Sequence, residues 1–317
     1  MLMTHRGLVV LALFLMPVSS SIALAQSELA EVGRLELGTT YCVLVRAGLA
    51  AASTNDGVVL IDVDDPDAPA VIARFELGSG VFGMCLMDDC LYLAAIQSGL
   101  VLVDIADPER PVELGRYTAP MPVTDVWSNG AVAVAQAMGG RTYVLDVSDP
   151  AAPVLRGTFG SGAMELGVTG IDSVAYVSTV TGIEILDLSD PATPRSLGNS
   201  AELIAAPART AERGILYLGG SNGVWVADTS SPETPRVVAQ FGGFEEVFDV
   251  AGGADLVVVA DLQGGVVVLD RGEPVGRAVV ARNTSYAPHG VAFDGEYIYV
   301  ADQDIGLVIL RLPDSAD

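Results

Sequence analysis

The chain has 317 residues, half of them hydrophobic, which is the composition of a globular protein and not of a disordered one. Its formal net charge is −24, and it contains no lysine. A field of that sign repels phosphate backbones and disfavours anionic membranes, so we expect no nucleic-acid partner.

Residues 1–25 have the plan of a secretory signal peptide. A basic residue precedes the apolar run Gly7 to Met16, Pro17 interrupts that run, and small residues occupy the −3 and −1 positions before a cut after Ala25. The run is shorter than a membrane span requires, and no cysteine for a lipid anchor directly follows the cut. The sequence therefore predicts a mature chain of residues 26–317 that is secreted, periplasmic or at the cell surface, with no membrane anchor after cleavage.

The mature sequence repeats with a regular period. Five-residue apolar runs that end in aspartate recur six times, and a seventh run ends in arginine. The steps between the closing residues are 42, 42, 41, 41, 42 and 41 residues. The runs are Val58 to Asp62, Leu100 to Asp104, Thr142 to Asp146, Ile183 to Asp187, Val224 to Asp228, Val266 to Asp270 and Leu307 to Arg311. A repeat that spans the mature chain predicts an array of similar units.

Each unit carries the same turn residues. In six of the seven units a glycine, such as Gly99 or Gly265, lies five residues before the closing residue, where it supplies the positive φ of a tight hairpin. After the closing residue comes a pair such as Asp107-Pro108, in which the aspartate bonds its downstream backbone and the proline presets φ. Each apolar run is therefore bounded by turns and is interpreted as a strand.

Within a unit the pattern predicts four short strands. In the second unit they are Gly83 to Met87, Leu91 to Ala95, Leu100 to Ile105 and Val112 to Tyr117. Several strands are apolar at nearly every position, which indicates that both faces of each sheet are covered. Four strands per repeat of this length are typical of a propeller blade. We predict an all-β fold, a single seven-bladed β-propeller with four-stranded blades.

The two ends of the chain predict how the ring closes. Gly33 to Leu37 resembles the fourth strand of other units, such as Ala73 to Leu77, and the chain ends after a third strand at Leu312. We therefore expect the N-terminal strand to pair in the last blade, so that the ring closes without a free sheet edge.

The units resemble the LVIVD repeats of a family of bacterial exported or surface propellers. The residues that carry the resemblance are Leu100 to Asp104 and its copies, the Ser-Asp-Pro turns at Ser148 and Ser189, and Ala301-Asp302 ahead of a hairpin glycine. The resemblance covers essentially all of the mature chain and implies a propeller outside the cytoplasm. Because the motif residues are scaffold positions, it implies no catalytic roles.

Cys42, Cys85 and Cys90 are the three cysteines. Around the turn between the last two, the expected register places Cys85 opposite Tyr92, so these two thiols do not face each other. We interpret the cysteines as small buried hydrophobic residues, and export leaves one disulfide open as an alternative.

Several kinds of catalytic site are excluded. His289 is the only histidine after residue 25, so a zinc site with two or three histidines is impossible, and no metal site is predicted. A Ser-His-Asp triad would have to use His289, and no Gly-x-Gly-x-x-Gly motif stands between a strand and a helix, as dinucleotide binding requires. Asp62 to Asp67 resembles a calcium loop superficially, but it lacks the required Gly and Glu and coincides with the proline turn of other units.

The candidate ligand site is a funnel on one face of the ring. Loops that enter the innermost strands share this face with loops that join the second and third strands, and strand ends converge at the centre. Converging acids repel one another, which raises their pKa or recruits a cation, so calcium is the one cofactor left open. The alternative is a merely solvated rim. The candidate residues are Asp125, Glu165, Glu246, Asp249, His289 and Asp302.

We therefore predict a non-catalytic interaction or ligand-binding propeller whose ligand is a protein or a small cationic or polyol molecule. The insertion Ala201 to Ala208, with Leu203 and Ile204, is the best candidate for a protein contact. The alternative is a hydrolase or lyase with an acidic active site in the funnel, where paired carboxylates could act as acid and base. The sequence does not fix the separation of those carboxylates.

Overall fold

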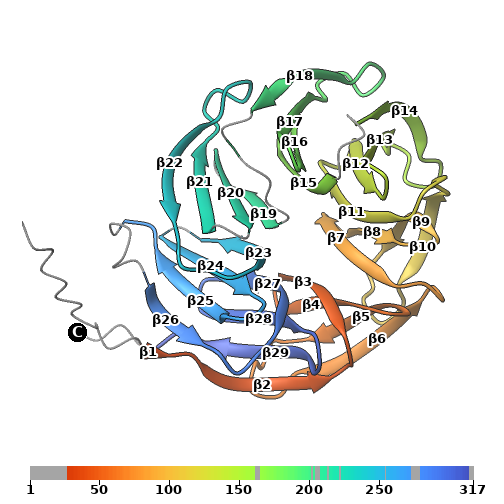
Figure 1. The fold of residues 1–317 in the computed structure, drawn as a ribbon. Helices are drawn as coiled ribbons and strands as arrows, with labels where there is room; N and C mark the ends of the chain where they lie inside the picture. The colour runs from red at the N-terminus through yellow and green to blue at the C-terminus, as the bar shows by residue number, and fades with distance from the viewer. Residues whose placement is uncertain are drawn as a thin grey trace, which may run out of the picture.

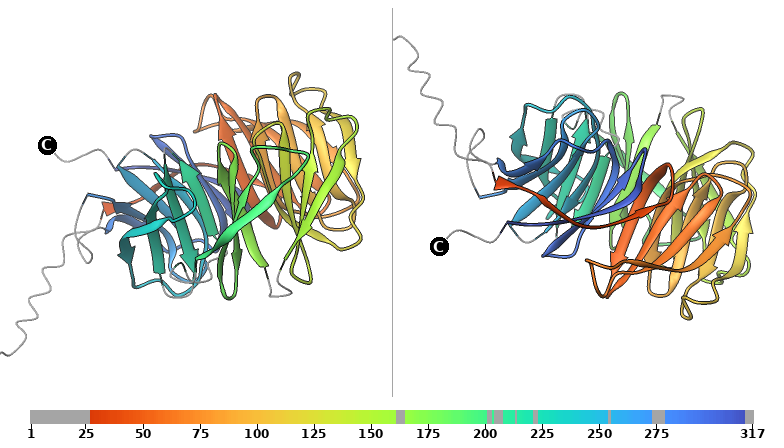
Figure 2. Two further views of the ribbon diagram at one scale, coloured as in Figure 1. Left: turned by 90° about the horizontal axis from the view of Figure 1, so that it is seen from above. Right: turned by 90° about the horizontal axis from the view of Figure 1, so that it is seen from below.

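The computed structural model describes residues 27–160, 165–200, 203, 208–212, 214–220, 223–253, 255–272 and 279–313. These residues form strands and turns, arranged as seven sheets around a central axis (Figure 1). Figure 2 shows the ring from its sides, where the sheets stand next to one another in a disc. The predicted seven-bladed β-propeller is confirmed. Within the described ranges, no helix has the length and apolarity needed to cross a bilayer.

The first four blades follow the chain, from the innermost to the outermost strand. Blade 1 contains β3 (Thr40–Arg46), β4 (Leu49–Thr54), β5 (Gly57–Asp62) and β6 (Ala70–Glu76). Blade 2 contains β7 (Val81–Met87), β8 (Cys90–Ala95), β9 (Gly99–Asp104) and β10 (Val112–Tyr117). Blade 3 contains β11 (Val123–Ser128), β12 (Val132–Ala137), β13 (Arg141–Asp146) and β14 (Val154–Phe159). Blade 4 contains β15 (Glu165–Ile171), β16 (Val174–Thr179), β17 (Gly182–Asp187) and β18 (Arg195–Ser200).

The last three blades complete the ring. Blade 5 contains β19 (Ala208–Glu212), β20 (Ile215–Gly220), β21 (Gly223–Asp228) and β22 (Arg236–Phe241). Blade 6 contains β23 (Val247–Gly252), β24 (Leu256–Asp261), β25 (Gly265–Asp270) and β26 (Val279–Asn283), and β1 (Ser27–Glu28) joins it as a fifth strand. Blade 7 contains β27 (Pro288–Phe293), β28 (Tyr297–Asp302), β29 (Gly306–Arg311) and β2 (Ala30–Glu36).

The predicted strands of the second unit lie within two residues of the observed ones. Cys85 pairs with Tyr92, as expected, and Met87 pairs with Cys90. No disulfide joins any two of Cys42, Cys85 and Cys90 in the structure, and burial raises the pKa of Cys85 to about 11. This favours the interpretation of the cysteines as packing residues over a disulfide.

The turn residues of the repeat build the backbone of each blade. Asp104 Oδ1 accepts a hydrogen bond from the Ala106 N–H (2.9 Å), and Asp107 Oδ1 accepts one from Glu109 (3.2 Å). The resemblance of Asp62 to Asp67 to a calcium loop has the same explanation, since Asp62 and Asp65 accept the equivalent bonds. The aspartates that close the apolar runs therefore hold turns.

The hairpin glycines meet two demands at once. Gly99 has φ of 84° and Gly265 has φ of 79°, a region that residues with a Cβ rarely adopt. A Cβ at either position would also collide with a backbone carbonyl oxygen of the fourth strand of the blade, at Tyr117 and Asn283 respectively. Glycine therefore allows both the tight turn and the close approach of the outer strand.

The core lies between blades and explains the continuous apolar runs. In β5, Val58 and Leu60 pack in a cluster shared with blade 2, whereas Val59 and Ile61 pack in a cluster shared with blade 7. All four side chains are no more than 2% exposed. Alternating residues of one strand thus cover opposite neighbours, so no face of the sheet is left for polar residues.

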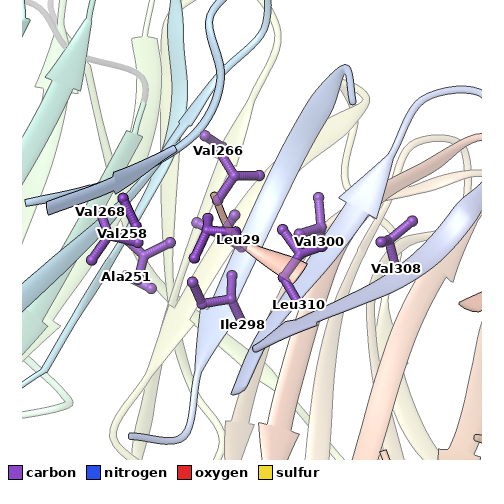
Figure 3. Packing of buried hydrophobic residues seen from close by; sticks show 12 residues of the cluster. Leu29, Ala251, Val258, Val266, Val268, Ile298, Val300, Val308 and Leu310 are labelled. Atoms are coloured by element: carbon purple, nitrogen blue, oxygen red, sulfur yellow. The ribbon is translucent and has the colours of Figure 1, made fainter. Parts of the chain in front are cut away.

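Ring closure follows the prediction and extends beyond it. β2 pairs antiparallel with β29 and completes blade 7, as expected from Gly33 to Leu37. In addition, β1 pairs parallel with β26 of blade 6. Between these two strands Leu29 is 1% exposed and packs among residues of both blades, including Val266, Val268, Ile298 and Leu310 (Figure 3). The N-terminal segment therefore ties blade 6 to blade 7.

Polar contacts fix the same segment. Asn283 Nδ2 donates to the Leu29 carbonyl oxygen (2.9 Å), and the Tyr286 hydroxyl donates to the Glu31 carboxylate, which also pairs with Arg34. The Arg34 guanidinium lowers the pKa of Glu31. Because the Leu29 carbonyl is held by a buried side chain from blade 6, the position of the segment is specified by hydrogen bonding as well as by packing.

We predict that Leu29→Ala lowers the free energy of unfolding by about 2–5 kcal/mol, because it opens a cavity between two blades. Chemical denaturation of the chain from residue 27 onward would measure this. The control is Val112→Ala on outer strand β10, where the side chain is 56% exposed and the expected loss is within about 0.5 kcal/mol. Equal losses in the two variants would show that the segment is not a structural tie.

Candidate functional site

The seven innermost strands surround the central channel, each packed against the next. All of them run in the same direction along the axis, since every blade has the same strand order. We call the face on which β3, β7 and the other innermost strands begin the top face, and the face on which they end the bottom face. The predicted funnel lies on the top face.

A cavity of about 520 Å³ occupies the channel toward the bottom face. Its lining residues come from six innermost strands, and in β3 they run from Cys42 to Arg46 at the strand end. The walls combine apolar side chains, such as Leu44, Met87 and Trp127, with polar groups such as Asp125 and Asp249. A cavity of this size is within the range of small-molecule sites.

Two of the predicted acids line this cavity and connect blades. Asp125 Oδ2 accepts a hydrogen bond from the Val168 N–H (2.8 Å), and Asp249 Oδ2 accepts one from the Val291 N–H (3.0 Å). In both cases the donor is on the innermost strand of the next blade. An innermost strand is a sheet edge, so its outward N–H groups need acceptors. Asp125 and Asp249 therefore join neighbouring blades at the channel wall.

The neighbouring strand makes room for these acids. Gly83 of β7 occupies the position that corresponds to Asp125, and a Cβ on Gly83 would collide with the Asp125 carboxylate. A bulky residue at every one of these positions would not fit, so the acids are confined to certain blades.

A β-bulge recurs near the start of the innermost strands. It shifts the register by one residue in blades 1, 2, 3, 4, 6 and 7, the six in which the described residues show one. An extra residue at a bulge redirects its side chain. The residues at this position are Tyr41, Phe82, Thr124, Leu166, Phe248 and His289.

Four of the bulge residues form a row of rings that we call the aromatic collar: Phe248, His289, Tyr41 and Phe82. Ring centroids are 5.2 Å apart for Phe248 and His289, 5.5 Å for His289 and Tyr41, and 4.5 Å for Tyr41 and Phe82. The rings come from blades 6, 7, 1 and 2, which are consecutive around the closed ring. All four are partly exposed, and none lines the cavity. The collar therefore lies at the top end of the channel.

Polar groups border the collar. The Tyr41 hydroxyl donates to Asn55 Oδ1 (2.9 Å). Burial lowers the pKa of His289, and the Thr40 backbone and the charges of Asp302 and Asp304 act in the opposite direction. His289 is thus held in an aromatic setting that disfavours its protonation, with carboxylates nearby.

The other predicted residues have different positions. Asp302 is 2% exposed, and its oxygens accept hydrogen bonds from the N–H groups of Ala287, Asp304 and Ile305 (2.8, 2.9 and 2.9 Å). Asp302 therefore fixes the loops beneath His289. Glu246 is exposed on the top rim, and its N–H donates to Asp261. Glu165 pairs through its backbone with Thr179, and its side chain lies outside the described residues.

The insertion after blade 4, which the sequence suggested as a contact for a protein partner, has a different role at Leu203. Leu203 is fully buried in the cluster between blades 4 and 5, so it belongs to the core. Ile204 lies outside the described residues.

Sequence reasoning found His289 but missed its three aromatic neighbours. Tyr41, Phe82 and Phe248 occupy the corresponding position of their units, in each case two residues before a buried residue, which is Val43, Met84 or Val250. An alignment of the units on those apolar residues would have grouped the rings. In the described part of the chain, no group of three or more His, Cys, Asp or Glu residues could hold a metal ion.

The sequence profile of the LVIVD repeat matches residues 85–119, 137–160 and 288–311. The chain therefore carries LVIVD repeats, as the resemblance implied. A search of curated protein sequences finds no relative of this chain.

Several solved structures are similar in fold. The β-propeller domain of Cps50 (Swd1) from Myceliophteria thermophila has a TM-score of 0.72 at 14% identity and covers 90% of this chain and 100% of that one. The computationally designed protein Ika8 has a TM-score of 0.63 at 11% identity, covering 86% of this chain and 83% of its own. BamB from Moraxella catarrhalis has a TM-score of 0.62 at 10% identity, covering 92% and 100%. At these identities the likeness concerns the fold alone.

We predict that His289 makes the stability of the ring depend on pH. Its pKa in the folded state lies below the ordinary 6.5, so between the two values the unfolded chain binds more protons. Stability should therefore fall as the pH is lowered through about 6.5. Denaturation midpoints between pH 8 and pH 5, measured for the chain from residue 27 onward, would show this fall. His289→Phe should flatten the curve, and identical curves for the two proteins would contradict the assignment.

Proposed function

We propose that this propeller of LVIVD repeats is a non-catalytic ligand-binding protein that works outside the cytoplasm and binds its ligand on the top face. The observation that carries the proposal is the aromatic collar. Four partly exposed rings from four consecutive blades meet at the centre of one face, where strand ends converge. Exposed aromatic groups that gather in this way offer a ligand a large contact area.

The scaffold role of the repeat residues supports this choice of site. The aspartates that close the apolar runs accept backbone hydrogen bonds in turns, and the apolar runs fill the core. In each of the four collar blades the bulge residue is partly exposed and lies outside the buried core clusters. That position is therefore the place where one propeller can differ in binding from another.

The geometry favours binding over the hydrolase or lyase alternative. An acid–base pair would need either His289 beside a carboxylate or two carboxylates side by side, and the nearby Asp302 already accepts three backbone hydrogen bonds. Asp125 and Asp249 accept backbone hydrogen bonds between blades. These carboxylates hold loops and strands in place, which is a structural task.

The proposed location rests on residues 1–25, which have the pattern of a secretory signal peptide. The high acidity of the chain suits an exported soluble protein.

A panel of ligands tests the proposal by thermal shift. The panel contains choline, N-acetylarginine amide, glucose, calcium chloride and a short neutral peptide, each with the wild-type chain and with Tyr41→Leu/Phe248→Leu. A ligand at a hundredfold excess over its Kd should stabilise the wild type by about 2.7 kcal/mol. We expect at least one panel member to raise the Tm of the wild type and not of the double variant.

A matched control separates collar loss from general damage. Tyr297 is a partly exposed tyrosine at the bottom face, so Tyr297→Leu should keep the shift. Absence of any shift across the panel would contradict the proposal. Turnover of nitrophenyl esters or glycosides by the wild type, lost in the double variant, would favour the hydrolase.

A further inference from the structure

We propose that the aromatic collar binds an organic cation, a quaternary ammonium or guanidinium group, over its ring faces. The inference rests on the proposed function, because it names the ligand class of the same site. Aromatic faces carry negative partial charge, and a cation within about 6 Å of a ring centroid is attracted to it.

The charges around the collar are complementary to a cation. Among the described residues, the loops that join strands on the top face contain Asp56, Glu245, Glu246 and Asp304, but no arginine. The chain has no lysine at all. By contrast, Arg110 and Arg271 lie in loops of the bottom face. The described top-face loops are therefore uniform in sign. The arginines near this face stand on outer strands and not on the innermost ones, since Arg141 begins β13 of blade 3 and Arg282 lies near the end of β26.

The acids are close in the chain to the individual rings. Asp56 follows Asn55, which accepts the hydrogen bond from the Tyr41 hydroxyl. Glu246 is two residues before Phe248, and its side chain is exposed. The charges of Asp302 and Asp304 act on His289. A ligand on the collar thus meets aromatic surface at the centre and carboxylates at the edge.

Aromatic rings surrounded by carboxylates also disfavour anions and neutral molecules as ligands. An anion would face carboxylates without a basic partner in the described loops, so its desolvation would not be compensated. A neutral apolar molecule would gain contact area but no electrostatic attraction. A cation with apolar substituents gains both, because it is weakly hydrated and can approach the rings closely.

Choline and its neutral carbon isostere, 3,3-dimethylbutan-1-ol, test the proposal directly. The two probes have nearly the same shape and differ in the charge. Isothermal titration calorimetry on the chain from residue 27 onward at pH 8 should give an affinity for choline at least roughly tenfold higher than for the isostere, as expected for a desolvated cation–π site. Equal affinities, or binding of the isostere alone, would overturn the proposal.

The variants separate the rings from general packing. Tyr41→Leu and Phe248→Leu keep an apolar side chain but remove the π system, and each should weaken choline binding by roughly twofold to thirtyfold. The control Tyr297→Leu removes a ring from the bottom face, where the Arg311 guanidinium carbon lies 5.3 Å from its centroid, and should leave choline binding unchanged. An equal loss in the control would contradict the collar as the site.

The pH dependence of choline binding gives a test on the wild-type chain alone, so it does not depend on whether the collar variants fold. His289 faces Tyr41 and the Thr40 backbone on β3, Phe248 on β23, and the charges of Asp302 and Asp304. Its protonation below pH 6.5 would put a positive charge inside the collar, so wild-type affinity for choline should fall between pH 8 and pH 5. Affinity for the isostere should stay level. A choline affinity that does not fall would count against the collar.

A second probe distinguishes a guanidinium group from a quaternary amine as the natural ligand. If N-acetylarginine amide binds more tightly than choline, the natural ligand carries a guanidinium group, as in a peptide; the reverse order indicates a free quaternary amine. If glucose gives a collar-dependent shift and neither cation binds, the inference fails and the proposed function stands. If no member of the panel binds, both fail.

Discussion

The fold depends on one constraint, which is that both faces of every sheet must be buried by neighbouring blades. In β5 the side chains of Val58 and Leu60 serve one neighbour and those of Val59 and Ile61 the other. Where sheets cover one another, a series in which each sheet must be covered twice leaves no bare face only if it closes, so the ring follows from the apolar runs. The first and last repeats share this demand, and β2 and Leu29 meet it by joining the two ends of the chain.

The same constraint limits where function can reside. Residues within the sheets are committed to packing, and the aspartates, prolines and glycines of the repeat are committed to turns. What remains are the loops and the innermost strands, whose inner edge faces the channel and not another strand. At that edge Asp125 and Asp249 accept hydrogen bonds from adjacent blades, and the bulges redirect Tyr41, Phe248 and His289 to the top of the channel.

These facts explain what the sequence could predict. The period, the turn residues and the uninterrupted apolar runs carry the fold, because packing and turn chemistry act locally and recur seven times. The parallel pairing of β1 was invisible, since it involves two residues and a partner more than 250 positions away. The collar was missed because the bulge adds one residue to each innermost strand, so its rings fall into line only when the units are aligned on the buried residues that follow them. Asp302 interrupts the apolar pattern for a structural reason, since it holds the N–H groups of a hairpin and a loop.

The collar spans the point where the ring closes, so a ligand bound to it affects the stability of the closed ring. Phe248 and His289 belong to the last two repeats, while Tyr41 and Phe82 belong to the first two, and Tyr41 and His289 stack across the boundary between blades 1 and 7. These rings meet only when the chain has closed its ring. A ligand bound across them therefore binds the closed state alone and stabilises it by mass action. Ligand binding at the top face and the N-terminal tie between blades 6 and 7 therefore both favour the closed ring.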